Sequence, residues 1–236
     1  MASRSAVFLD LASVDRGDLD LSALHQAASP WTTHLQTPAD LAAARIGDAV
    51  VAVTNKVVVD RSVMAACPCL RLICVAATGT NNVDLGAARE RGITVSNVTG
   101  YATPSVVEHV FALLLALQRR LIEQQHAAHT LWAHQRGFCV LDYPTAELHG
   151  KTLGIVGYGE LGRAVASVGT AFGMQVLLAQ RPGGDDRVGR IPLDDLLRRA
   201  DVLSLHCPLS PATTTALILF MACPCPSCGA PGTRVG

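Results

Sequence analysis

The chain has 236 residues, half of them hydrophobic and 16% charged, with 19 Lys and Arg residues against 19 Asp and Glu residues. This length is enough for one large domain or two small ones, and the balanced charge predicts no surface for nucleic acid or an anionic membrane. The longest apolar run, residues 110–117, is far shorter than the ~20 residues of a membrane span. Because residues 1–10 include no apolar signal segment, we expect a soluble, cytoplasmic protein without disulfides.

Short apolar runs alternate with helical patterns through the first hundred residues. The expected strands are residues 6–9, 49–53, 72–76 and 93–98. The expected helices are residues 21–28, 38–46 and 85–91. This alternation predicts a parallel α/β sheet, in which the second and third strands are buried on both faces.

The segment after residue 102 predicts a long helix. Thr103 is suited to the N-cap and Pro104 to the first turn. Apolar residues then follow almost without a polar break to Leu117. A helix that is apolar on most sides is buried, so we expect it to lie between two domains or two subunits. Residues 126–144 are more polar and predict an irregular crossing between domains.

A second alternating unit begins at Lys151, with strands expected at residues 153–156, 175–179 and 202–205. Helices are expected after the first of these strands, up to Gly173, and over residues 193–200. Between the first strand and its helix lies the motif Gly157-Tyr158-Gly159-Glu160-Leu161-Gly162. A strand, this glycine spacing and a helix are together typical of the first half of a Rossmann dinucleotide-binding domain.

Each glycine of the motif has its own expected role. Gly157 permits the tight turn, Gly159 lets the backbone approach a pyrophosphate, and Gly162 lets the helix pack closely on the strand. The N–H groups of Glu160 and Leu161 are expected to point at the phosphate, with the helix dipole behind them.

The residues that end the second strand of this unit bear on the choice of cofactor. An acidic residue there favours NAD, whereas a nearby Arg accommodates the phosphate of NADP. The sequence has Gln180-Arg181, so we expect NAD or NADP with NADP favoured. A solvated turn is the alternative role for Arg181.

Three segments carry a family resemblance. They are residues 76–84 (AATGTNNVD), residues 92–109 (GITVSNVTGYATPSVVEH), and residues 150–181 together with residues 205–209 (LHCPL). The chain resembles the D-isomer-specific 2-hydroxyacid dehydrogenases over residues 6–218, most closely their glycerate dehydrogenase (hydroxypyruvate reductase) branch.

The resemblance implies an α/β chain of several parts. They are a flavodoxin-like substrate domain (1–102), an interdomain or dimerisation helix and crossing (103–149), and half of a doubly wound Rossmann domain (150–218). It implies that Thr78 and Gly79 offer N–H groups to the substrate carboxylate. Asn55 and Lys56 would line the same cleft, with a solvated turn as the alternative.

The resemblance also implies a cofactor site and an activity. Thr103 would lie near the nicotinamide and its phosphates, and Cys207 and Pro208 would line the adenosine side. The neighbouring His206 is expected to have a structural role there and not to be the proton donor. The implied activity is reversible hydride transfer between NAD(P)H and a small 2-oxo acid, such as hydroxypyruvate or glyoxylate, in a homodimer.

The sequence departs from the family pattern after residue 218. The catalytic Arg, Glu and His of the family would lie beyond this point, and motifs like Asn-Thr-Ala-Arg-Gly or Pro-His-Ser do not occur. We therefore assign no catalytic residue and expect a truncated, inactive chain in which the strand at 153–156 becomes an exposed edge. The alternative is a fragment that binds a dinucleotide, or forms a dimer with a second copy of this chain, but catalyses nothing.

The last eighteen residues, 219–236, are rich in Pro, Gly and Cys and show no helix or strand period. We interpret this tail as an aberrant, out-of-frame end, and expect no metal. The alternative is a thiolate metal site formed by Cys223, Cys225 and Cys228.

Overall fold

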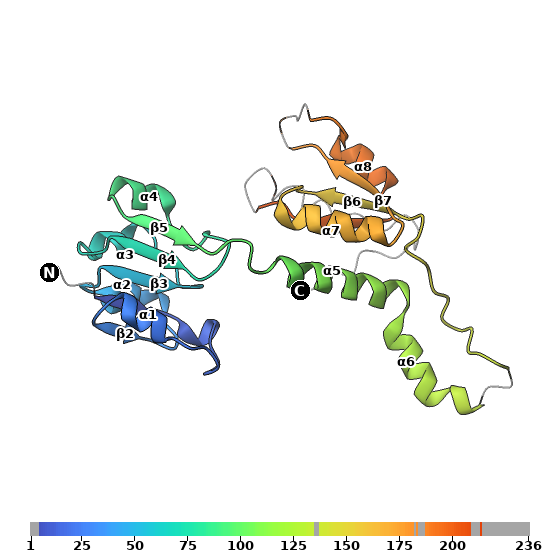
Figure 1. The fold of residues 1–236 in the computed structure, drawn as a ribbon, viewed down its shortest axis with the longest axis horizontal. Helices are drawn as coiled ribbons and strands as arrows, with labels where there is room; N and C mark the ends of the chain where they lie inside the picture. Colours follow the sequence, from blue (N-terminus) through green and yellow to red (C-terminus); the bar gives the residue numbers. More distant parts are fainter. Residues whose placement is uncertain (1–4, 135–136, 182, 184–186, 209–212, 214–236) are drawn as a thin grey trace. The chain divides into compact units, whose positions relative to one another are not determined.

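The computed structural model describes residues 5–134, 137–181, 183, 187–208 and 213. The chain divides into two compact units, Met1–Tyr101 (unit 1) and Ala102–Gly236 (unit 2). Each unit contains its own parallel sheet with helices packed against it (Figure 1). Among the described residues, no helix has the length and apolar character that a membrane crossing needs.

Unit 1 is built on five parallel strands in the order β2-β1-β3-β4-β5, the flavodoxin-like order. The strands are β1 (Ala6–Phe8), β2 (Trp31–Thr33), β3 (Val51–Thr54), β4 (Leu72–Val75) and β5 (Thr94–Asn97). The four strands expected in this region are therefore confirmed, with ends that differ by one or two residues. The sequence did not reveal β2, because this short edge strand exposes Thr32 and Thr33 and shows no apolar run.

Helices cover both faces of the unit 1 sheet. They are η1 (Leu11–Ser13), α1 (Ser22–Ala27), η2 (Ala39–Leu41), α2 (Ala42–Ile46), α3 (Arg61–Ala66) and α4 (Leu85–Glu90). Side chains alternate along each strand. Ile73 is therefore buried in a cluster with residues of α2, α3 and α4, whereas Val53 packs on the other face with Leu24 of α1.

The described residues of unit 2 form four parallel strands in the order β8-β7-β6-β9. They are β6 (Thr152–Val156), β7 (Gln175–Ala179), β8 (Arg190–Ile191) and β9 (Val202–Leu205). The expectation that the strand at 153–156 is an exposed edge is wrong. β9 pairs with β6 on the side opposite β7, so Leu153 and Ile155 are fully buried.

The named helices in the described residues of unit 2 are α5 (Thr103–Gln118), α6 (Leu121–Thr130), η3 (Trp132–His134), α7 (Glu160–Ala171) and α8 (Leu193–Arg199). α5 and α7 share a core with Leu153 and Ile155, and α8 packs on the other face of β6, where Leu196 lies against Gly154.

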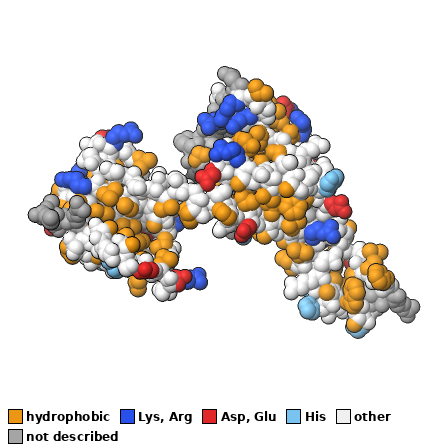
Figure 2. Space-filling view, in the orientation of Figure 1, with side chains coloured by type: hydrophobic (Ala, Val, Ile, Leu, Met, Phe, Trp, Pro, Cys, Tyr) orange, Lys and Arg blue, Asp and Glu red, His pale blue; other side chains and the backbone are white. Residues whose placement is uncertain are grey.

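In unit 2 taken by itself, α5 is buried on one face, and the expected burial between two domains or two subunits stays a prediction. Phe111 and Leu114 are buried, but Leu113 is 53% exposed and Leu117 is 75% exposed. Only one face of α5 meets the sheet and α7. Figure 2 shows apolar side chains at the surface along α5 and α6.

Candidate functional site

The first candidate site lies in the loop that follows β3, and a buried carboxylate at the end of β1 shapes it. The Asp10 carboxylate accepts hydrogen bonds from the backbone N–H groups of Asn55 (2.9 Å) and Lys56 (2.7 Å). Asp10 is only 5% exposed. A buried carboxylate must be hydrogen-bonded, and these two bonds fix the course of the loop after β3.

The side chains of Asn55 and Lys56 differ in what they can offer a ligand. Asn55 is buried, and its Nδ2 donates to the Ser13 hydroxyl at 3.0 Å. The Lys56 side chain is exposed, and no described residue forms an ion pair with its amine. Lys56 lines a shallow cavity of about 350 Å³ between the loops that follow β1, β2 and β3. Of the pair, Lys56 is therefore the residue with an available charged group.

The turn after β4 presents backbone groups at the same edge of the sheet. Thr78 and Gly79 are exposed, and the Asn97 side chain donates to the Thr78 carbonyl at 2.8 Å. Within the described residues, no acceptor pairs with the N–H groups of Thr78 and Gly79. These N–H groups are available to an anion such as a carboxylate.

Hydrogen bonds join the loops after β3 and β4. The Val59 N–H donates to the Asn82 carbonyl (2.8 Å), and the Asn82 side chain donates to the Val57 carbonyl (3.0 Å). The two loops therefore form one connected edge that places Lys56 and the Thr78–Gly79 turn on neighbouring strands.

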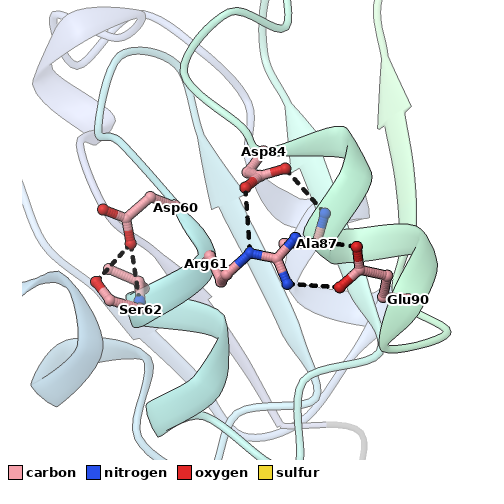
Figure 3. A network of polar contacts seen from close by, with 7 residues as sticks. Asp60, Arg61, Ser62, Asp84, Ala87 and Glu90 are labelled. Atoms are coloured by element: carbon pink, nitrogen blue, oxygen red, sulfur yellow. Dashed lines mark hydrogen bonds and ion pairs between the residues drawn. The ribbon is translucent and has the colours of Figure 1, made fainter.

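Each loop ends in a helix cap. The Asp60 carboxylate accepts from the Val63 N–H to begin α3, and the Asp84 carboxylate accepts from the Ala87 N–H to begin α4. Arg61 pairs with Glu90 through two hydrogen bonds and lies 3.9 Å from Asp84, so it links the two helices (Figure 3). The hydrogen bond and charge of Arg61 lower the pKa of Glu90.

The second candidate site is the glycine loop between β6 and α7. Gly157 has φ +96°, and a Cβ there would lie 2.5 Å from the Cys207 N and His206 C atoms. A Cβ on Gly162 would lie 2.1 Å from the Gly157 carbonyl oxygen. The loop therefore packs backbone against backbone on both sides, which only glycine allows at these two positions.

Gly159 differs from the other two glycines because its surroundings are open. A Cβ there would meet nothing within 4 Å. Gly159 is the N-cap of α7 and supplies no side-chain cap, so side chains of the described residues leave the first N–H groups of α7 unpaired. An uncapped helix N-terminus with open space in front of it can bind an anion.

The prediction that Thr103 caps the long helix is wrong. Ala102 is the N-cap, and Thr103 is the first helical residue. The Thr103 hydroxyl donates instead to the carboxylate of Glu160, the first residue of α7, at 2.6 Å. A hydrogen bond to a residue far away in the sequence has replaced the local cap that the pattern indicated.

Two arginines, Arg181 and Arg190, lie near the end of β7, the strand that follows α7. The Gln180 N–H donates to the Ile191 carbonyl at 2.8 Å, and Arg181 is exposed. The guanidinium of Arg190, on β8, lies 5.9 Å from the centre of the Tyr158 ring in the glycine loop. Pairing of β8 with β7 thus brings Arg190 to the glycine loop.

The segment after β9 contains a partly buried histidine. The backbone N–H of His206 donates to the Val156 carbonyl at 2.7 Å, and the ring Nε2 of His206 lies 2.8 Å from the Ser204 hydroxyl. Burial lowers the pKa of His206. Cys207 follows with its backbone against Gly157, and the exposed Pro208 accepts a hydrogen bond from Thr213 (2.7 Å).

Sequence reasoning missed two residues of these sites. Asp10 directly follows an apolar run, so its place at the carboxyl end of a strand was a usable signal. Arg190 had no local signal, because only the pairing of β8 with β7 brings it to Tyr158. The residues proposed for a thiolate metal site, Cys223, Cys225 and Cys228, lie outside the described residues.

Gly162→Ala and Gly159→Ala are expected to differ in stability. The Gly162 methyl group would overlap the Gly157 carbonyl, which costs about 1–3 kcal/mol. The Gly159 methyl group meets open space, so its cost is that of a poorer cap, under about 1 kcal/mol. Urea unfolding of both variants checks this, and equal loss in both would contradict the packing described for Gly162.

His206 is expected to make the stability of unit 2 depend on pH. Because its pKa is lower in the folded chain, the unfolded chain binds the proton more readily, and stability falls as the pH drops below the ordinary histidine pKa. His206→Gln should reduce the loss of stability between about pH 7.5 and pH 5.5, whereas His129→Gln, on an exposed position of α6, should not. Thermal unfolding at several pH values measures this, and the same pH profile in all three proteins would contradict it.

Comparison with known proteins identifies the family of this chain. Residues 111–218 match the family model described as D-isomer specific 2-hydroxyacid dehydrogenase, NAD binding domain. The chain is 39% identical to hydroxypyruvate reductase of Blautia hydrogenotrophica, over 88% of this chain and 66% of that protein. It is 37% identical to glycerate dehydrogenase of Methylorubrum extorquens, over 89% of this chain and 66% of that protein.

A solved structure agrees with these relatives. The TT0316 protein of Thermus thermophilus is 30% identical with a TM-score of 0.74, over 90% of this chain and 68% of that one. The chain spans between one third and two thirds of the length of the curated relatives that it matches. From the matched domain, these relatives and the shared fold, the chain belongs to the D-isomer-specific 2-hydroxyacid dehydrogenase family.

Proposed function

We propose that this chain supplies the substrate-recognition and cofactor-binding parts of an NAD(P)-dependent oxidoreductase that acts on small 2-hydroxy acids. The reaction is reversible hydride transfer between the nicotinamide cofactor and a 2-oxo acid such as hydroxypyruvate or glyoxylate. The observation that carries the proposal is the open, uncapped start of α7 at Gly159.

The residues of the glycine loop fit the pyrophosphate of a dinucleotide. The backbone at Gly159 has room for a phosphate to approach, and the first N–H groups of α7 face that space without a side-chain cap. The close packing at Gly157 and Gly162 holds this backbone in place. The bound cofactor would supply the hydride chemistry, while these residues bind and orient it.

The loops of unit 1 fit a small carboxylate. The exposed N–H groups of Thr78 and Gly79 would receive the carboxylate of the substrate, and the Lys56 amine would add a positive charge at the same edge of the sheet. Asn55 has a supporting role in this proposal, because its amide nitrogen is already bonded to Ser13.

The end of β7 favours NADP over NAD in this proposal. Gln180 stands where an acidic residue would select NAD, and Arg181 is exposed beside it. Arg190, over the Tyr158 ring, adds a second guanidinium near the loop. Cys207 and Pro208 would lie on the adenosine side, with His206 supporting the loop.

A homodimer is part of the same proposal. The exposed apolar side chains of α5 and α6 support it, since a contiguous apolar surface marks an interaction site. These side chains are Leu113, Leu117, Leu121 and Ile122.

Dinucleotide binding without turnover is the second candidate function. The sequence has no motif of the kind that carries the catalytic Arg or His in the family. Oxidation of NADH or NADPH in the presence of hydroxypyruvate separates the two candidates. Turnover supports the oxidoreductase, and saturable binding without turnover supports the second candidate.

Gly159→Ala is expected to weaken binding of NADH and NADPH by about tenfold, because a methyl group would stand between the backbone and the pyrophosphate. Its fold should survive, because the methyl meets no neighbouring atom. Fluorescence titration with both nucleotides measures the Kd. Unchanged affinity in a folded Gly159→Ala variant would overturn the proposed cofactor site.

Arg181→Gln is expected to raise the Kd for NADPH by about tenfold, the loss of one charge-assisted hydrogen bond, and to leave the Kd for NADH within about twofold. Arg199→Gln, on the exposed side of α8, is the matched control and should change neither value. An equal effect of Arg181→Gln on both nucleotides would contradict the preference for NADP.

A further inference from the structure

The glycine loop contains a negative charge of its own. Glu160 is the first residue of α7 and lies directly after Gly159. Its carboxylate accepts the Thr103 hydroxyl at 2.6 Å, and no Lys or Arg of the described residues forms an ion pair with it. The charge of Glu160 is therefore held in place by a neutral donor and is not neutralised by a cation.

Two helix N-termini meet at this carboxylate. Thr103 is the first residue of α5 and Glu160 the first of α7. Further along, the ring of Phe111 in α5 stacks on the ring of Phe172, directly after the end of α7, with their centres 5.2 Å apart. α5 and α7 therefore run side by side in the same direction (Figure 1). Because each helix has partial positive charge at its N-terminus, the two dipoles together favour an anion at this place.

The pyrophosphate of a bound dinucleotide would need the same positive potential. In the proposed function it faces the first N–H groups of α7, within one turn of the Glu160 side chain. Two like charges one helical turn apart repel each other, and in a dielectric close to that of water the repulsion costs about three- to tenfold in affinity. The Glu160 carboxylate would thus weaken binding of the dinucleotide that the glycine loop is proposed to bind.

We propose that Glu160 is an internal anion that competes with the cofactor's phosphates for the paired N-termini of α5 and α7, and so lowers cofactor affinity. The proposal rests on the proposed function, because it presumes that the glycine loop binds a dinucleotide. Thr103 is a positioning residue in this arrangement, since its hydroxyl holds the carboxylate at the start of α7.

Glu160→Gln tests the charge alone. The glutamine amide oxygen can still accept the Thr103 hydrogen bond, so the contact between α5 and α7 remains while the charge is lost. Glu147→Gln is the matched control. It makes the same change at an exposed position in the loop before β6, at the opposite edge of the sheet from the glycine loop.

The experiment is fluorescence titration of the wild-type chain and both variants with NADH and with NADPH, at about 0.01 M and about 1 M salt. Thermal unfolding of each protein accompanies it. We expect Glu160→Gln to lower both Kd values by about three- to tenfold at low salt and by less at high salt, because salt screens the repulsion. Glu147→Gln should match the wild type at both salt concentrations.

Three outcomes would overturn the proposal. If Glu160→Gln binds as the wild type does at low salt, the carboxylate does not compete with the phosphates. If Glu160→Gln binds more weakly although it is folded, the carboxylate contributes to binding. If none of the three folded proteins binds either nucleotide, the proposed cofactor site itself fails, and the role of Glu160 fails with it.

Discussion

Parallel hydrogen bonding between strands is the constraint on which both units of the chain depend. Every strand in the two sheets runs in the same direction as its neighbours. Each connection must therefore return to the starting edge, and the loops that follow the strands gather at the carboxyl edge. Asp10, Lys56 and Thr78 reach one edge of unit 1 in this way, and the glycine loop and His206 reach one edge of unit 2.

Within each unit, contacts made to the main chain of the loops define these edges. In unit 1, the Asp10 carboxylate holds two N–H groups of the loop after β3, and main-chain bonds join that loop to the one after β4. In unit 2, Gly157 and Gly162 remove the side chains that would keep the loop away from its neighbours. The outcome in both units is a fixed backbone that leaves N–H groups directed at solvent, which is the requirement for recognising an anion.

The sequence was sufficient wherever the signal was local. Apolar runs located seven strands, and the glycine spacing located the turn between β6 and α7. It failed where a distant residue decided the outcome. The Thr103 side chain is of a type that caps helices, but its hydroxyl donates a hydrogen bond to the Glu160 carboxylate instead. The strand at 153–156 is interior because β9 pairs with it, and Arg190 reaches the glycine loop only through the pairing of β8.

The three atoms nearest to a Cβ placed on Gly157 are main-chain atoms of the segment after β9, namely those of His206 and Cys207. A main-chain surface is nearly the same whichever side chains it carries. Random mutation should therefore find position 157 intolerant of every other amino acid, whichever side chains occupy positions 206 and 207. In the evolution of this loop, the glycine must be inherited, because a change of the side chains it packs against would not make room for a Cβ at position 157.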